Sequence, residues 1–114
     1  MGLRKPTERE AGAIKFLFAK GGRSDLLGVD LNNLLVEDTD HEGIGGLALH
    51  PEGERASPGS RWFGRCLSET EFNDVDGKRV LVSLYVDQDG EALELDVWKV
   101  NHDPLLGALP EFIR

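Results

Sequence analysis

The first strong pattern along the chain is a stripe of apolar residues at helical spacing near the N-terminus. Before it, Thr7 and Glu10 fit a capping box, in which the hydroxyl and the carboxylate each accept a hydrogen bond from a free backbone N–H. After it, Gly21 and Gly22 tolerate the left-handed conformation in which many helices end. The pattern therefore predicts a helix over Glu8–Lys20. Its apolar stripe consists of Ala11, Ile14, Leu17 and Phe18.

The pattern between residues 24 and 60 is weaker. Leucines at helical spacing, interrupted by glycine and asparagine, suggest a short helix near Asp25–Leu31 and then a strand around Leu34–Asp38. Thr39–Gly43 is expected to be a turn and Ile44–His50 a strand. Pro51–Ser60 is rich in Pro, Gly and Ser without periodicity, and we expect an exposed, mobile loop.

The second half reads as a β-meander in which two Asp-Gly pairs separate three β-rich runs. A two-residue turn at Asp89-Gly90 opposes apolar residues at three positions, whereas a one-residue slip would oppose apolar to polar. These predicted pairs are Val86–Leu93, Leu84–Leu95 and Val82–Val97.

The first Asp-Gly pair, Asp76-Gly77, fits a three-residue loop over Val75–Gly77 better, with the glycine in the left-handed conformation. This loop predicts the pairs Phe72–Val80, Thr70–Val82 and Cys66–Val86. One face of the meander is then apolar and needs a cover, for which the N-terminal helix is the candidate. We expect a single α+β domain over residues 1–114, with the helix packed on an antiparallel meander of four to five strands. The predicted core face is Cys66, Phe72, Val80, Val82, Leu84, Val86, Leu93, Leu95 and Val97.

Alternation assigns mostly polar residues to the opposite face. The registers place Glu94 across from Tyr85, Asp96 across from Ser83, and Trp98 across from Leu81. This face is either an ordinary solvated surface, with Trp98 and Leu81 covered by the C-terminal segment, or a protein-binding surface. In the second case the aromatic side chains would anchor the interface and the carboxylates would select a basic partner. Its predicted members are Leu67, Glu69, Glu71, Leu81, Ser83, Tyr85, Asp87, Glu94, Asp96 and Trp98.

Composition narrows the class of protein. The 114 residues include 13 Lys and Arg against 21 Asp and Glu, for a formal charge of −8. Residues 1–23 carry a balance of +4 and the rest −12. Contact with phosphate needs a basic footprint, so we expect neither nucleic acid nor anionic membrane as a partner. With one cysteine and no apolar run long enough to cross a bilayer, the expected compartment is the cytoplasm.

No catalytic or metal-binding motif stands out. The histidines His41, His50 and His102 lack the spacing of a metal-binding helix. Asp87-x-Asp89-Gly90 fits a hairpin better than a calcium loop, because an EF-hand frame would place Tyr85 at its first ligand position. Cys66, assigned to the core face, is expected to be a packing residue. We therefore expect no enzyme and no cofactor.

Three stretches show a family resemblance. Leu3-Arg4-Lys5-Pro6-Thr7-Glu8-Arg9-Glu10 opens the chain, and Leu93-Glu94-Leu95-Asp96-Val97-Trp98-Lys99-Val100 followed by Pro104-Leu105 closes it. With the strand Ser83-Leu84-Tyr85-Val86-Asp87, they resemble a family of small bacterial proteins of unknown function. The resemblance implies a shared fold and a bacterial origin, and it implies no mechanism.

The leading functional expectation is a non-enzymatic, acidic protein-binding domain of the immunity type, which would inhibit a basic bacterial toxin such as a nuclease. This expectation rests on analogy with other small acidic proteins. The alternative is a small-molecule or metal-binding domain, or a weak hydrolase, around His41 and His50. A homodimer formed through the Trp98 face is a third possibility. The expected partner-binding residues are Glu69, Glu71, Tyr85, Glu94, Asp96 and Trp98.

Overall fold

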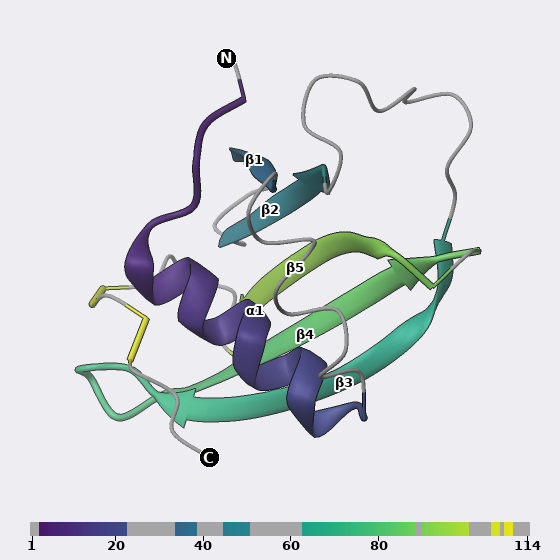
Figure 1. Ribbon diagram of the computed structural model, residues 1–114. Coiled ribbons are helices and arrows are strands. Elements are labelled where there is room, and N and C mark those ends of the chain that lie inside the picture. The colour runs from purple at the N-terminus through teal and green to yellow at the C-terminus, as the bar shows by residue number, and fades with distance from the viewer. Residues whose placement is uncertain are drawn as a thin grey trace.

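The computed structural model describes residues 3–22, 34–38, 45–50, 63–88, 90–100, 106–107 and 109–110 (Figure 1). In these residues one helix, α1 (Glu8–Lys20), packs on one face of a five-stranded antiparallel sheet, which confirms the predicted α+β fold. The strand order is β1-β2-β5-β4-β3, and the helix lies across β3 and β4. The strands are β1 (Leu35–Asp38), β2 (Gly45–His50), β3 (Phe63–Asn73), β4 (Arg79–Asp87) and β5 (Ala92–Lys99).

The strands predicted at Leu34–Asp38 and Ile44–His50 correspond to β1 and β2. The predicted helix near Asp25–Leu31, turn at Thr39–Gly43 and loop at Pro51–Ser60 lie outside the described residues. No helix in the described part of the chain has the length and apolar character needed to cross a membrane.

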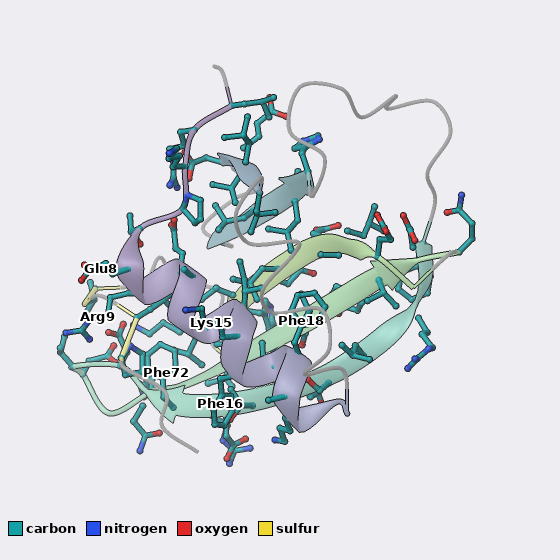
Figure 2. All side chains as sticks on the ribbon, in the orientation of Figure 1. Glu8, Arg9, Lys15, Phe16, Phe18 and Phe72 are labelled. Carbon is teal, nitrogen blue, oxygen red and sulfur yellow. The ribbon has the colours of Figure 1, made fainter. Side chains whose placement is uncertain are left out.

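Helix α1 begins and ends as the sequence predicts. The Glu10 N–H donates to Thr7 Oγ1 at 3.2 Å and the Thr7 N–H donates to Glu10 Oε1 at 2.9 Å, which completes the capping box. Gly22 follows the helix with φ +81°, a conformation that glycine adopts without steric cost. The exposed side of the helix carries Glu8, Arg9 and Lys15 (Figure 2).

The hydrophobic core lies between α1 and the sheet. The helix buries Ala13, Ile14, Leu17 and Phe18, whereas the predicted stripe residue Ala11 is only half-buried. The phenylalanines Phe16 and Phe72 are partly buried against this core (Figure 2). The sheet contributes Val36, Leu47, Leu49, Leu67, Val80, Val82, Leu84, Val86, Ala92, Leu95 and Val97.

The β3–β4 hairpin has the predicted loop over Val75–Gly77. Gly77 has φ +83°, and the Asp74 N–H donates to the Lys78 carbonyl oxygen at 2.9 Å across the loop. The predicted pairs Phe72–Val80 and Thr70–Val82 are both present.

The third predicted pair of this hairpin, Cys66–Val86, is wrong. A register shift between Cys66 and Ser68 pairs Cys66 with Tyr85, so its side chain is exposed, and turns Leu67 into the core. The helix end explains this β-bulge, because Ser68 Oγ donates to the Leu17 carbonyl oxygen at 2.6 Å. Leu67 then packs beneath Gly21, where an added Cβ would lie 2.5 Å from Leu67 Cγ.

The β4–β5 turn also differs from the prediction at one pair. Leu84–Leu95 and Val82–Val97 are confirmed, but Val86 pairs with Ala92 instead of Leu93. The turn is closed at Asp87, whose N–H donates to the Glu91 carbonyl oxygen at 2.8 Å and whose Oδ1 accepts from the Glu91 N–H at 3.0 Å. The turn is therefore longer than two residues, and a bulge at Leu93 restores the predicted register.

Candidate functional site

The sheet face opposite α1 brings together all six residues predicted to bind a partner. The observed pairs Tyr85–Glu94, Ser83–Asp96 and Leu81–Trp98 are those expected from the sequence. Across the next strand, Glu69 pairs with Ser83 and Glu71 with Leu81. We call this surface the acid–aromatic face. It consists of Glu69 and Glu71 from β3, Tyr85 from β4, and Glu94, Asp96 and Trp98 from β5.

The acid–aromatic face is accessible, although not uniformly. Glu69 and Glu71 are exposed, and the other four members are half-buried. Leu67, which was predicted on this face, lies in the core instead because of the β3 bulge. On the neighbouring strand β2, the residues opposite Asp96 and Glu94 are Gly46 and Ala48. Neither of these two residues has a side chain long enough to reach over the carboxyl groups.

Glu94 and Asp96 interact directly. They lie two residues apart on β5, so both side chains project from the same face of the sheet. A hydrogen bond between the two carboxyl groups, together with partial burial and the negative charge of Asp96, raises the pKa of Glu94 to about 7. Two carboxylates this close repel each other when both are ionised, so the neutral form of one of them is favoured. This pair therefore changes charge near neutral pH.

The centre of the face is tied together by hydroxyl groups. Ser83 Oγ donates to Glu69 Oε2 at 3.1 Å, which links β4 to β3. Partial burial raises the pKa of Tyr85, although a hydrogen bond with the Ser83 side chain opposes the rise. The Tyr85 ring also packs against Phe63, with centroids 5.5 Å apart and planes tilted by 57°. Phe63 is 59% exposed, so aromatic surface remains available beside the carboxylates.

Two further side chains modify this surface. Arg79 Nε lies 4.0 Å from Glu71 Oε2, so Glu71 is partly neutralised by an exposed ion pair. Cys66 lies beside the face, where partial burial and the negative charge of Glu69 raise the pKa of its thiol. A raised pKa keeps the thiol protonated at neutral pH, and a protonated thiol is a poor nucleophile.

The alternative site around the histidines is only partly described. His41 and His102 lie outside the described residues. His50 is half-buried on β2, with Nε2 3.9 Å from Glu37 Oε1 on β1. Within the described ranges, no three His, Cys, Asp or Glu side chains lie close enough to hold a metal ion. The described residues thus bring one carboxylate to His50 and no third ligand.

A buried ion pair that was not predicted from the sequence lies at the end of the sheet. Lys99 Nζ lies 2.9 Å from Asp74 Oδ2 and 2.8 Å from Asp76 Oδ2, and the side chains of Lys99 and Asp74 are only 2% and 1% exposed. Asp74 also accepts hydrogen bonds from the N–H groups of Leu106 and Gly107, which holds the C-terminal segment against the hairpin. Burial disfavours the ionised form of Asp74, but these backbone bonds and Lys99 together hold its pKa well below the ordinary value.

A signal for this pair was present in the sequence. Strand alternation from Val97 places Lys99 on the core side of β5, and a lysine in such a position needs a carboxylate partner. Two aspartates lie in the adjacent hairpin loop. Both buried charges are held by hydrogen bonds within the described residues, which is typical of a structural role.

Arg4 forms a second ion-pair group that the sequence analysis did not predict. Its guanidinium donates to Glu10 at 2.8 and 3.0 Å and to Asp38 at 2.8 and 3.1 Å, and so joins α1 to β1. The backbone of Arg4 also pairs with Val36, which extends the sheet along β1. The sequence predicted only a capping role for Glu10. Its link to Asp38, which Arg4 bridges, joins residues that lie 28 positions apart in the sequence.

A family model described as a domain of unknown function, DUF6984, matches residues 3–109. Searches of curated proteins and of solved structures returned no match. The match covers α1, all five strands and the acid–aromatic face.

Proposed function

The chain belongs to the DUF6984 family, whose description assigns no function, so we propose a function from the geometry. We propose that the chain is a non-enzymatic protein-binding domain whose acid–aromatic face binds a basic partner. The observation that carries the proposal is the gathering of four carboxylates and two half-buried aromatic side chains on the sheet face opposite α1. Tyrosine and tryptophan supply rigid contact area, and carboxylates select for lysine and arginine.

The finer proposal is that this domain is a bacterial, cytoplasmic inhibitor of the immunity type. Its target would be a basic toxin such as a nuclease, whose cationic residues otherwise hold nucleic acid. The formal charge of −8 supports this choice, because opposite net charges speed the association of two proteins at low ionic strength. The surface is suited to cover a basic active site, and it offers no activated nucleophile among its described residues.

The proposal is tested by capture followed by a measured affinity. The immobilised chain is exposed to lysate of its native host, and a retained basic protein is purified and titrated against wild type and the variant Glu69→Gln. We expect Glu69→Gln to weaken binding by about two- to fivefold, the effect of an exposed ion pair worth up to about 1 kcal/mol. Inhibition of the captured protein's nuclease activity by one equivalent of the chain would support the immunity role.

The matched control is Glu8→Gln, which removes the same charge from the exposed side of α1, across the molecule from the face. Its affinity should equal that of the wild type. Retention of no basic protein, or equal weakening by both variants, would contradict the proposal. Sedimentation tests self-association through Trp98: a particle of twice 12.6 kDa that Trp98→Ala dissociates would mean that this face binds a second copy.

A further inference from the structure

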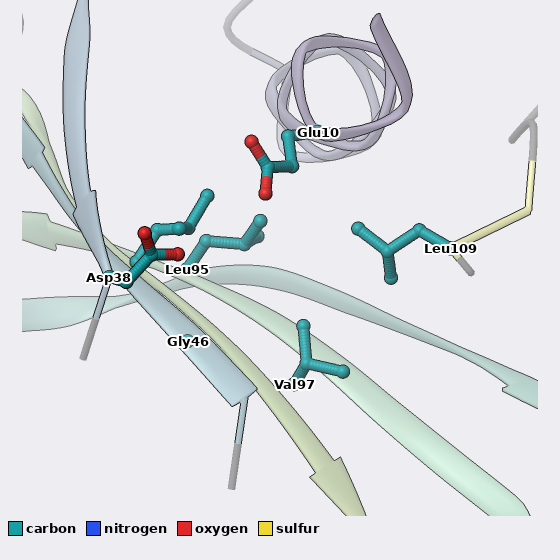
Figure 3. A pocket seen from close by; sticks show the side chains of 7 residues that line it. Glu10, Asp38, Gly46, Leu95, Val97 and Leu109 are labelled. Carbon is teal, nitrogen blue, oxygen red and sulfur yellow. The ribbon is translucent and has the colours of Figure 1, made fainter. Parts of the chain in front are cut away.

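A cavity lies on the other side of the sheet from the acid–aromatic face, between the first turns of α1 and strands β2 and β5 (Figure 3). Its volume is about 170 Å³. Glu10 projects toward it from α1, Val97 on β5 lies across from Glu10, and Leu109 lies at one side (Figure 3). The Leu109 segment is held there by a 3.0 Å hydrogen bond from Arg9 Nη1 to the Leu109 carbonyl oxygen. Its lining residues are Glu10, Asp38, Gly46, Leu47, Leu95, Val97 and Leu109.

The cavity has an apolar body and a polar end. Four of its lining residues are aliphatic, so the body suits an apolar group, and its volume is enough for about six non-hydrogen atoms. The polar end is formed by the carboxylates of Glu10 and Asp38. The Asp38 side chain is 60% exposed, so this end meets solvent.

The hydrogen bonds at the polar end define which ligand can bind. Arginine has five N–H donors, and those of Arg4 are all used: two toward Asp38, two toward Glu10 and one toward the Lys5 carbonyl oxygen. No donor of Arg4 remains for an anion. The carboxylates have acceptor capacity beyond these bonds, because two carboxylates offer about eight lone-pair sites. The polar end therefore accepts hydrogen bonds from a ligand.

The net charge at the polar end also favours a ligand that donates hydrogen bonds. Two carboxylates face the guanidinium of Arg4, which leaves an excess of one negative charge at the polar end, while the guanidinium of Arg9 is bound to the Leu109 carbonyl oxygen. The hydrogen bonds from Arg4 lower the pKa of Asp38, so that this charge persists at neutral pH. A cation with a short hydrocarbon stem satisfies both parts of the cavity.

We propose that this cavity binds a small alkylammonium group, with its aliphatic stem against Leu47, Leu95 and Val97 and its N–H donors toward Asp38 and Glu10. The proposal is independent of the protein-binding function, because the cavity and the acid–aromatic face lie on opposite sides of the sheet. The same group is carried by a free amine or by a lysine side chain, and the experiment separates these sources.

The test is titration with n-butylammonium chloride, followed by amide shifts in ¹H–¹⁵N NMR spectra. N-butanol and butyrate serve as neutral and anionic probes of the same length, and N-acetyl-lysine methylamide represents a lysine side chain. We expect millimolar binding of butylammonium, weaker binding of butanol, none of butyrate, and shifts at Leu47, Leu95 and Val97. Tighter binding of the lysine amide than of butylammonium would identify a protein side chain as the source of the group.

Two variants and one control make the test specific. Asp38→Asn keeps the shape of the cavity and removes one charge, and it should weaken butylammonium about tenfold, the size of one charge-assisted hydrogen bond. Val97→Leu adds a methylene to the lining and should weaken butylammonium and butanol together. The control Glu37→Gln removes the same charge one residue earlier on β1, where Glu37 faces His50, and should bind like wild type.

Thermal melts establish that each variant is folded before its affinity is compared. Absence of butylammonium binding to the folded wild type would overturn the proposal. Equal weakening by Glu37→Gln and Asp38→Asn would also overturn it, because it would indicate attraction to the net charge. Shifts confined to the acid–aromatic face would overturn the assignment of the site to this cavity.

Discussion

The carboxyl groups of Glu94 and Asp96 share a hydrogen bond on β5, on the face of the sheet that α1 leaves uncovered. Their closeness follows from strand geometry, since residues i and i+2 project on the same side. The small residues Gly46 and Ala48 across the strand pair bring no cation to separate them. One consequence is a protonation change near neutral pH.

The free energy of unfolding should fall as the Glu94 carboxyl group loses its proton. The pKa of Glu94 is raised from 4.5 to about 7 on folding, so the folded state holds the proton more tightly than the unfolded state does. Its contribution is complete below about pH 4.5 and is lost as the pH rises toward about 7. Glu94→Gln imitates the protonated form, so the difference in melting temperature between variant and wild type should grow in favour of the variant over this range. A ¹³C titration of the Glu94 carboxyl with a midpoint near its ordinary value would contradict this.

Removal of the buried cation should be strongly destabilising. Lys99→Met leaves Asp74 ionised, 1% exposed and without its cationic partner, and an uncompensated buried charge is costly. We expect this variant to have the largest loss of denaturant stability among those discussed. The control Lys78→Met removes an exposed lysine from the same hairpin and should change stability little. Equal losses would mean that the pair is not the cause.

Two glycines of the helix region should respond in opposite ways to the same substitution. At Gly21 an added methyl group meets Leu67 Cγ, and overpacking of this kind costs about 1–3 kcal/mol. At Gly12, inside α1, an added methyl group meets nothing within 4 Å, so Gly12→Ala should stabilise by about 0.5–1 kcal/mol through helix propensity. Urea unfolding of both variants measures the difference. A stabilising Gly21→Ala would show that Leu67 does not pack beneath the helix end.

The thiol of Cys66 should react slowly for an exposed cysteine. Burial of the sulfur and the charge of Glu69 raise its pKa above the ordinary value of 9.0, so the thiolate is scarce at pH 8. The rate of alkylation by iodoacetamide should therefore still increase with pH above 9. In Glu69→Gln the pH midpoint should shift downward, because the negative charge of Glu69 is one of the causes that raise the pKa of the thiol. A wild-type midpoint below 9 would contradict the assigned environment of the thiol.

The parts of the fold that depend on neighbouring residues were predictable. The capping box of α1 and the left-handed glycine of the Asp76-Gly77 loop are local geometries with clear residue preferences. Alternation and turn length then predicted most of the pairing between β3, β4 and β5. For the same reason, the six members of the acid–aromatic face were assigned correctly to one side of the sheet. Their binding role stays a prediction.

Apart from the longer turn between β4 and β5, the errors occurred where a distant segment changes the strand. A bulge at Leu67 is invisible in the local pattern, because Leu67 turns inward to pack beneath the end of α1, almost fifty residues earlier. The contacts of Lys99 with Asp74 and of Arg4 with Asp38 likewise join residues 25 and 34 positions apart. The cavity beside Glu10 exists only where the helix, two strands and Leu109 meet.

The chain thus encodes its helix, its turns and the polarity of its two sheet faces in short-range patterns, since each depends on backbone preference and on a period of two or 3.6 residues. Which side chains become buried partners, and where a space remains between elements, is settled by packing. Packing depends on how well the shapes of segments remote in the sequence fit together, and this fit cannot be read from any sequence periodicity.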